Sequence, residues 1–208
     1  MNIPKSIVVF GASSAFGKHD VEGGGFVGRL RRWHDEIDAG NATYNLAISG
    51  QCIEDLYDRF EAECGPRKPN LIVLQLGNND AMRQGSIENP PHTDYDEYEA
   101  QLGQLLSRMK EIAPIILVGS MPFDEARTTP VHWADVFYKI DDVQNYEQIQ
   151  KNLAIRAGIE YIDMFAEWEG DELNSYLDAD GLHANSEGHE FIFEKIRDKI
   201  LAVYGANQ

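Results

Sequence analysis

Residues 71–77, Leu71-Ile72-Val73-Leu74-Gln75-Leu76-Gly77, form the clearest strand signal in the chain. The run is apolar apart from one glutamine, and it ends at a glycine, which is typical of a strand buried on both faces of a parallel sheet. The polar tetrad Gly77-Asn78-Asn79-Asp80 comes directly after it. The sequence therefore places chemically capable side chains at the carboxyl end of a buried strand.

Strand and helix signals alternate along the whole chain. Apolar runs predict strands over residues 6–10, 43–47, 71–76, 115–118 and 159–162. Apolar residues at three- and four-residue spacing predict helices that begin near Phe26, Gly50, Tyr98, Val143 and Ser186. This alternation predicts an α/β protein, a three-layer α/β/α sandwich around a central five-stranded parallel sheet. We expect one domain spanning residues 1–208, since nothing in the composition marks an internal boundary.

The composition excludes some classes of partner. A formal net charge of −17 would repel a polyanion, and the densest basic cluster, residues 29–32, is too small to offset it. We therefore expect no nucleic-acid partner and no anionic-membrane partner. The apolar runs are too short to cross a bilayer, so no stable membrane insertion is expected. No signal-peptide pattern opens the chain, which predicts a cytoplasmic protein.

The two cysteines, Cys52 and Cys64, fall in one predicted helical region. Twelve residues of helix would separate them by roughly 18 Å, which is too far for a disulfide. Their spacing is not that of metal ligands either. We interpret them as ordinary, partly buried thiols.

Three polar segments are predicted to meet at one edge of the sheet. Ser13 follows the first predicted strand, Gly50 follows the second, and Asn79 follows the third. Binding sites of parallel α/β sheets lie beyond the carboxyl ends of the strands. We therefore expect these three residues to border one site.

A serine hydroxyl acts as a nucleophile near neutral pH only when a nearby base takes its proton. His183 is the best candidate for that base, because Asp180 precedes it by three residues and Gly181 permits a tight turn between them. The other histidines divide by predicted location. His34 and His189 fall in helix patterns and are expected to be surface or half-buried, whereas loops that could border a pocket hold His19, His92 and His132.

In their order along the chain, these segments resemble the blocks of the SGNH hydrolase superfamily, also called GDSL esterases/lipases. The blocks here are Gly11-Ala12-Ser13, Gly50 within residues 45–50, Gly77-Asn78-Asn79-Asp80 and Asp180-Gly181-Leu182-His183. The resemblance covers essentially the whole chain and implies the flavodoxin-like fold of that superfamily. It implies Ser13 as nucleophile, His183 as base and Asp180 as its orienting acid. It also implies an oxyanion hole formed by Ser13, Gly50 and Asn79, with no metal and no organic cofactor.

Two positions depart from the family pattern. Ala12 stands where the family has an aspartate before the nucleophile, and Ala47 stands where it often has glycine. That aspartate is not the triad acid, so we expect Ala12 to change the hydrogen bonding of the turn rather than remove the mechanism. A catalytically weak binding protein with this fold stays an alternative. A nucleotide-binding flavodoxin-like domain is disfavoured, because residues 11–17 lack the glycine spacing and the lysine of phosphate-binding loops.

The sequence thus predicts a serine esterase that hydrolyses small acyl esters through an acyl-enzyme, with a small-molecule ester as its partner. A carbohydrate O-deacetylase, a lysophospholipase or a thioesterase would use the same machinery, so these alternatives stay open. The loop 82–93 and the insertion 120–140 are expected to wall the pocket. The aromatic side chains of the insertion would contact substrate, tie the insertion to the body or form a surface for a homo-oligomer: Phe123, Trp133, Phe137 and Tyr138.

Overall fold

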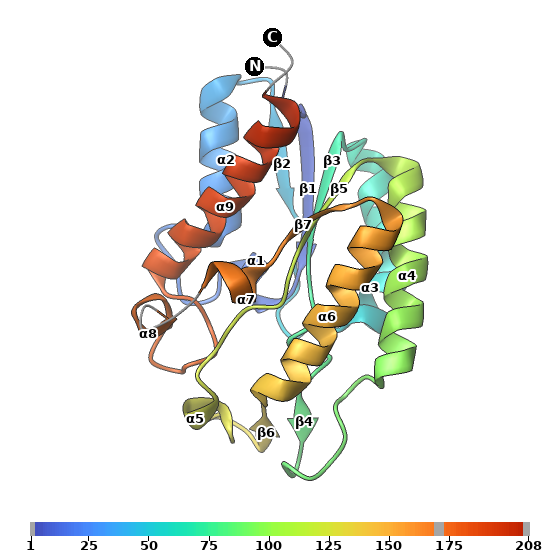
Figure 1. The fold of residues 1–208 in the computed structure, drawn as a ribbon. Coiled ribbons are helices and arrows are strands. Elements are labelled where there is room, and N and C mark those ends of the chain that lie inside the picture. The colour runs from blue at the N-terminus through green and yellow to red at the C-terminus, as the bar shows by residue number, and fades with distance from the viewer. Residues whose placement is uncertain (1–2, 169–172, 206–208) are drawn as a thin grey trace.

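Five parallel strands form the central sheet of the protein, as shown by a computed structural model that describes residues 3–168 and 173–205 (Figure 1). The strands are β1 (Ser6–Gly11), β2 (Ala42–Asn45), β3 (Leu71–Gln75), β5 (Ile115–Val118) and β7 (Glu160–Ile162). Their order across the sheet is β2-β1-β3-β5-β7, and every neighbouring pair is parallel. The carboxyl ends of all five strands therefore share one edge.

Helices cover both faces of this sheet (Figure 1). One face carries α2 (Gly25–Ile37) and α9 (Ser186–Tyr204), and the other carries α3 (Ile53–Cys64), α4 (Tyr95–Ile112) and α6 (Ile140–Ala157). The predicted three-layer α/β/α sandwich is confirmed. Within the described ranges, no helix combines the length and the apolar character needed to cross a bilayer.

The strands send alternate side chains into two apolar clusters. In β1, Val8 and Phe10 belong to the cluster under α3, α4 and α6, whereas Ile7 and Val9 belong to the cluster under α2 and α9. All four side chains are fully buried. Burial on both faces explains why these strands read as continuous apolar runs and not as an alternation of apolar and polar residues.

Several short elements were not predicted from the sequence. They are α1 (Ser13–Phe16), η1 (Gly65–Arg67), β4 (Arg83–Gln84), α5 (Glu125–Thr128), β6 (Val136–Phe137), α7 (Met164–Glu167) and α8 (Leu173–Tyr176). Elements of two to four residues are too short to show an apolar period. The antiparallel pair β4–β6 joins the 82–93 loop to the insertion 120–140.

The sequence predicted that a helix begins near Gly50, but helix α3 begins at Ile53. Gly50 has a φ of +83°, which lies outside the helical region. The first N–H group of the helix, that of Ile53, instead donates to the buried Asp80 at 3.0 Å. Cys52 and Cys64 stand at the two ends of this helix, and both are buried free thiols.

His34 and His189, expected to be surface or half-buried, are both fully buried. That prediction was wrong because each ring pairs both of its nitrogens inside the protein. His34 binds the Thr43 hydroxyl at 2.8 Å and a backbone carbonyl oxygen at 2.7 Å. His189 accepts from the Phe26 N–H group at 3.3 Å and donates to the Lys18 carbonyl at 3.0 Å. Burial lowers the pKa of both rings, which favours their neutral forms.

Glu147 on α6 ties that helix to the ends of two strands. Its carboxyl group accepts from the Ser120 N–H group at 2.5 Å, just beyond β5, and from the Tyr161 hydroxyl of β7. The side chain is buried, and this burial raises the pKa of Glu147 to about 7. The folded protein therefore keeps a proton there at mildly acidic pH that the unfolded chain releases.

We predict that Glu147→Gln flattens the dependence of the unfolding free energy on pH. Below a pH of about 4.5 the Glu147 carboxyl is protonated in both states, and its contribution to stability is fully present. As the pH rises through about 7, that contribution is lost in the wild type, by up to about 3 kcal/mol. Glutamine stays neutral throughout. Urea denaturation of both proteins at several pH values measures the difference, and parallel stability curves would contradict the prediction.

Candidate active site

Ser13 stands at the carboxyl edge of the sheet, where β1 ends and the one-turn helix α1 begins. The turn depends on Gly11, because a Cβ atom there would lie 2.6 Å from the Ala15 Cβ atom and 2.7 Å from the Gln75 carbonyl oxygen. A side chain at position 11 would push α1 away from the sheet. The close approach that glycine permits therefore fixes the position of Ser13.

Asp180 and His183 lie in a tight loop just before α9. The Asp178 N–H group donates to the His183 carbonyl at 2.8 Å, which closes the loop. Inside it, Asp180 Oδ1 accepts from the backbone N–H groups of Leu182 and His183, at 2.8 and 2.9 Å. These bonds fold the chain so that the carboxylate and the imidazole of the Asp-x-x-His segment meet.

A continuous chain of hydrogen bonds links Ser13, His183 and Asp180. Ser13 Oγ lies 2.9 Å from His183 Nε2, and His183 Nδ1 lies 2.6 Å from Asp180 Oδ2. A carboxylate only accepts, so the neutral ring must carry its proton on Nδ1. Nε2 is then free to accept the serine proton, which is the tautomer that a general base requires.

The Asp180 carboxylate stays ionised although it is buried. Burial by itself would raise the pKa of Asp180. The hydrogen bonds from the His183 ring and from two backbone N–H groups outweigh burial, so the pKa lies well below its usual range. A fixed negative charge beside His183 can stabilise the positive charge that the ring acquires when it takes a proton.

In the tetrad after β3, Asn78 and Asp80 make structural hydrogen bonds, whereas Asn79 lines the pocket. Asn78 exchanges two hydrogen bonds with the Met121 backbone, at 2.7 and 2.8 Å. Asp80 is fully buried and accepts from the first N–H group of α3, and burial raises the pKa of Asp80 to about 6. Asn79 is the member of the tetrad that lines the main pocket of the site.

Ser13, Gly50 and Asn79 all line this pocket, and each has an N–H group to offer. The backbone N–H groups of Ser13 and Gly50 donate to no other backbone or side-chain atom of the described residues. The Asn79 amide donates one hydrogen bond to the Gln51 carbonyl at 3.0 Å, and its second N–H is available to another acceptor. Three N–H donors beside a serine hydroxyl can stabilise an oxygen that gains negative charge.

Tyr138, which follows β6, fixes the orientation of the Asn79 amide. Its buried hydroxyl donates to Asn79 Oδ1 at 3.2 Å, while Asn79 Nδ2 donates to the Gln51 carbonyl. A flipped amide would set Oδ1 against that carbonyl oxygen, so the two partners together select one orientation. The sequence placed Tyr138 in the pocket wall but gave no signal for this contact.

The pocket has a volume of about 400 Å³. The insertion 120–140 contributes His132, Trp133 and Tyr138 to its wall, as expected. None of residues 82–93 lines it, although the structure describes all of them, so that expectation was wrong. This loop instead makes structural contacts, through the pairing of β4 with β6 and the 2.6 Å ion pair between Arg83 and Asp142 of α6.

The aromatic residues of the insertion divide between the core and the pocket wall. Phe123 is fully buried in the apolar cluster, and Tyr138 is buried between that cluster and the pocket, so both tie the insertion to the body. Trp133 is 50% exposed, and its ring centre lies 6.1 Å from that of His183. Trp133 is therefore an aromatic surface that a bound ligand would meet.

His19 makes contacts that sequence reasoning missed. Its Nε2 atom lies 3.0 Å from Asp180 Oδ2, and its Nδ1 atom lies 3.4 Å from Asp178 Oδ2. The sequence indicated only that His19, His92 and His132 lie in loops that could border a pocket. His19 and His132 line it, and His92 does not. No local pattern marks His19, because its carboxylate partners lie far along the chain.

His19, Asp180 and His183 also place one potential metal ligand each within 4.8 Å of one another. They are the one such group of histidine, cysteine or acidic residues in the ranges 3–168 and 173–205. The hydrogen bond of His183 Nδ1 with Asp180 Oδ2 at 2.6 Å, and the contact of His19 Nε2 with the same oxygen at 3.0 Å, bring these atoms together.

Serine, histidine and carboxylate lie in series at the carboxyl edge of an α/β/α sheet, an arrangement that is typical of hydrolases. Residues 9–191 match the GDSL-like Lipase/Acylhydrolase family, and the chain belongs to this family. The protein is a carboxylic ester hydrolase of the SGNH/GDSL type, as the sequence predicted.

Curated relatives agree with this assignment, and solved structures share the fold. A GDSL esterase/lipase from Arabidopsis thaliana is 24% identical over 200 residues, which are 91% of this chain and 76% of the relative. An acetylxylan esterase from Geobacillus stearothermophilus is 32% identical over 94 residues, 44% of this chain and 42% of the relative. The structure of a lipase/acylhydrolase from Enterococcus faecalis superposes with a TM-score of 0.77 at 22% identity, over 97% of this chain and 98% of that one.

We predict that Gly50→Ala folds but is less stable than the wild type by about 1 kcal/mol. An added Cβ atom would meet no atom within 4 Å, so the cost comes from the φ of +83°, which disfavours any residue with a side chain. Chemical denaturation measures this difference.

Gly65→Ala is the matched control for this backbone effect. Its added Cβ atom also meets nothing within 4 Å, but its φ of −53° suits alanine. We expect this variant to be as stable as the wild type or slightly more stable. Equal stability of the two variants would show that the backbone at Gly50 is not strained by a side chain.

Proposed function

We propose that the protein is a serine esterase that hydrolyses esters of small acyl groups, with Ser13 as nucleophile, His183 as base and Asp180 as orienting acid. The observation that carries the proposal is the unbroken chain of hydrogen bonds from Ser13 Oγ through His183 to Asp180, at 2.9 and 2.6 Å. It supplies what a serine needs to become nucleophilic, a base within reach and in the correct tautomer.

The reaction then proceeds in two halves through an acyl-enzyme. Ser13 Oγ attacks the ester carbonyl as its proton passes to His183 Nε2, and the positive ring is stabilised by Asp180. The carbonyl oxygen becomes an anion that accepts hydrogen bonds from Ser13, Gly50 and Asn79. The intermediate collapses as His183 gives its proton to the leaving alkoxide. Water, activated by the same histidine, attacks the acyl-enzyme, and the acid leaves with Ser13 restored.

The substrate class follows from the shape and the lining of the pocket. A volume of about 400 Å³ at the surface suits a small acyl group attached to a larger alcohol that extends outward. Trp133, half exposed beside His183, offers an aromatic face on which a sugar ring can stack. A carbohydrate O-deacetylase is therefore the second candidate, and the partial similarity to an acetylxylan esterase supports it.

We predict that Ser13→Ala lowers the turnover of p-nitrophenyl acetate by about 10³-fold or more, because the acyl acceptor is lost. Ser14→Ala is the matched control, since the neighbouring serine is buried and, among the described residues, forms no hydrogen bond with His183 or Asp180. We expect that control to keep its activity. Turnover by the wild type should fall from acetate to butyrate to octanoate esters if the pocket selects small acyl groups.

The outcome of this comparison separates the candidate functions. Substantial turnover by Ser13→Ala would overturn the assignment of the nucleophile. Activity on acetylated xylo-oligosaccharides well above that on p-nitrophenyl acetate would favour the deacetylase. Absence of turnover on every ester, together with measurable ligand binding, would favour the catalytically weak binding protein considered because of Ala12.

We predict that Tyr138→Phe lowers kcat by about tenfold and leaves KM nearly unchanged. The variant loses the hydrogen bond to Asn79 Oδ1 and so frees the amide to turn away from the developing oxyanion. Steady-state kinetics on p-nitrophenyl acetate measures both constants. Tyr57→Phe is the control: it removes the hydroxyl of half-buried Tyr57 on α3, which donates to Gln104 of α4, and it should behave as the wild type. A rise in KM with unchanged kcat would show that Tyr138 only shapes the pocket.

A further inference from the structure

His19 occupies an unusual place beside the proposed triad. It lies between two carboxylates, with Nε2 at 3.0 Å from Asp180 Oδ2 and Nδ1 at 3.4 Å from Asp178 Oδ2. Its ring centre is 5.2 Å from that of His183. Asp180 Oδ2 therefore receives two imidazoles, one from His183 and one from His19.

The backbone of His19 is held in a conformation that histidine rarely adopts. Its φ is +64°, in the left-handed region, which costs a residue with a side chain about 1 kcal/mol. Such a conformation persists only where the surrounding structure imposes it. The residues on either side of His19, Lys18 and Asp20, are therefore expected to be held in place by the surrounding structure.

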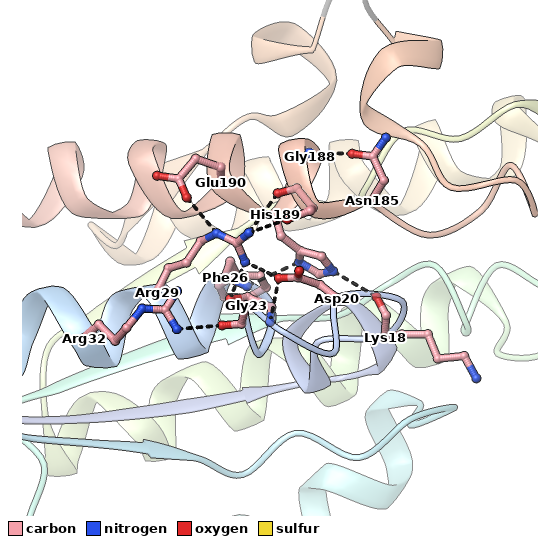
Figure 2. A network of polar contacts seen from close by, with 12 residues as sticks. Lys18, Asp20, Gly23, Phe26, Arg29, Arg32, Asn185, Gly188, His189 and Glu190 are labelled. Atoms are coloured by element: carbon pink, nitrogen blue, oxygen red, sulfur yellow. Dashed lines mark hydrogen bonds and ion pairs between the residues drawn. The ribbon is translucent and has the colours of Figure 1, made fainter.

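Both flanking residues are anchored in a buried polar network between α2 and α9 (Figure 2). The Lys18 carbonyl accepts from His189 Nε2 at 3.0 Å. The Asp20 carboxylate accepts from the Gly25 N–H group at 3.0 Å and forms an ion pair with Arg29. Asp20, Arg29 and His189 are all buried, so these anchors are shielded from solvent.

The guanidinium of Arg29 connects the network to α9. Its Nε atom donates to Glu190 at 2.7 Å, and Nη2 donates to the Ser186 hydroxyl and carbonyl at 2.8 and 3.1 Å (Figure 2). Helix α9 begins immediately after the loop that carries Asp180 and His183. The network therefore fixes the segment around His19 relative to α9 and to the loop before α9 that carries Asp180.

We propose that His19 is a positioning residue, whose Nε2 atom, 3.0 Å from Asp180 Oδ2, makes a polar contact that holds the carboxylate in line with His183. The inference rests on the proposed function, in which Asp180 orients the base. Asp180 Oδ1 is held by two backbone N–H groups and Oδ2 by His183 Nδ1, and the contact with His19 adds a further restraint on Oδ2. Within the described residues, no hydrogen bond or ion pair joins His19 to Ser13, so His19 acts through Asp180.

The contact with the His19 ring also offsets part of the negative charge that Asp180 presents to His183. Removal of this contact should leave more of that charge to stabilise the positive ring that His183 becomes during the reaction. Other charged or titratable groups around the two rings are unchanged by that removal, and they lie on several elements: Lys18 beside His19, Asp178 in the loop before α9, His132 of the insertion, Tyr138 before α6, and His189 of α9.

Two substitutions at one position test the proposal. His19→Leu removes the polar contact with Asp180, and His19→Gln keeps a polar N–H group at a similar reach. For His19→Leu we expect kcat on p-nitrophenyl acetate to fall about tenfold with KM changed less than twofold, and the acidic limb of kcat/KM to move to higher pH. For His19→Gln we expect kcat and the acidic limb to return toward the wild type. Active sites are counted by titration with a fluorophosphonate, so misfolded protein does not enter kcat.

Val21→Ala is the control for the segment, because Val21 is 95% exposed on the same loop. It should match the wild type in every measurement. The proposal is overturned if His19→Leu retains wild-type kcat and acidic limb, if both His19 variants lose activity equally with an unmoved limb, or if only KM changes. Ser13→Ala is assayed in parallel to separate this failure from that of the proposed function. Loss of activity in Ser13→Ala would uphold Ser13 as the nucleophile even if the His19 variants overturn the role of His19.

Discussion

The parallel pairing of β1 with both β2 and β3 is the constraint on which the site depends. Because β1 lies between these two strands, the segment that follows it is flanked on one side by the segment after β2 and on the other by the segment after β3. Ser13 therefore lies between Gly50 and Asn79, at a spacing set by the distance of about 4.8 Å between neighbouring strands. A different strand order would leave the serine without donors on both sides.

A second constraint is the need to satisfy buried polar groups. Ser13 and His183 are 170 residues apart, and the loop that carries His183 is held by hydrogen bonds rather than by the sheet. Asp180 accepts hydrogen bonds from two backbone N–H groups and from His183, and it contacts His19. Next to it, Asp20 pairs with Arg29, and His189 donates to the Lys18 carbonyl (Figure 2). An unpaired polar group in these places would cost several kcal/mol, so each contact helps to determine the others.

The sequence predicted the layers because strands buried on both faces read as apolar runs, and helices with one apolar side read at a period of about 3.6 residues. It also predicted that Ser13, Gly50 and Asn79 share an edge, since that follows from strand direction alone. It could not predict contacts that depend on distant chain segments meeting, such as Tyr138 with Asn79 or His19 with Asp180. The buried histidines were missed for the same reason, since their partners, such as the Phe26 N–H group, lie far from them in sequence.

Ala12 bears on whether the machinery is intact. Its side chain is buried, and it belongs to the apolar cluster that includes Phe10 and Leu182. With alanine there, the contacts of Ser13 with His183 and of His183 with Asp180 still form. A carboxylate in the same apolar surroundings would need a partner of its own to offset its desolvation. The geometry of the three polar side chains therefore does not depend on an acid at position 12, which weakens the argument for an inactive binding protein.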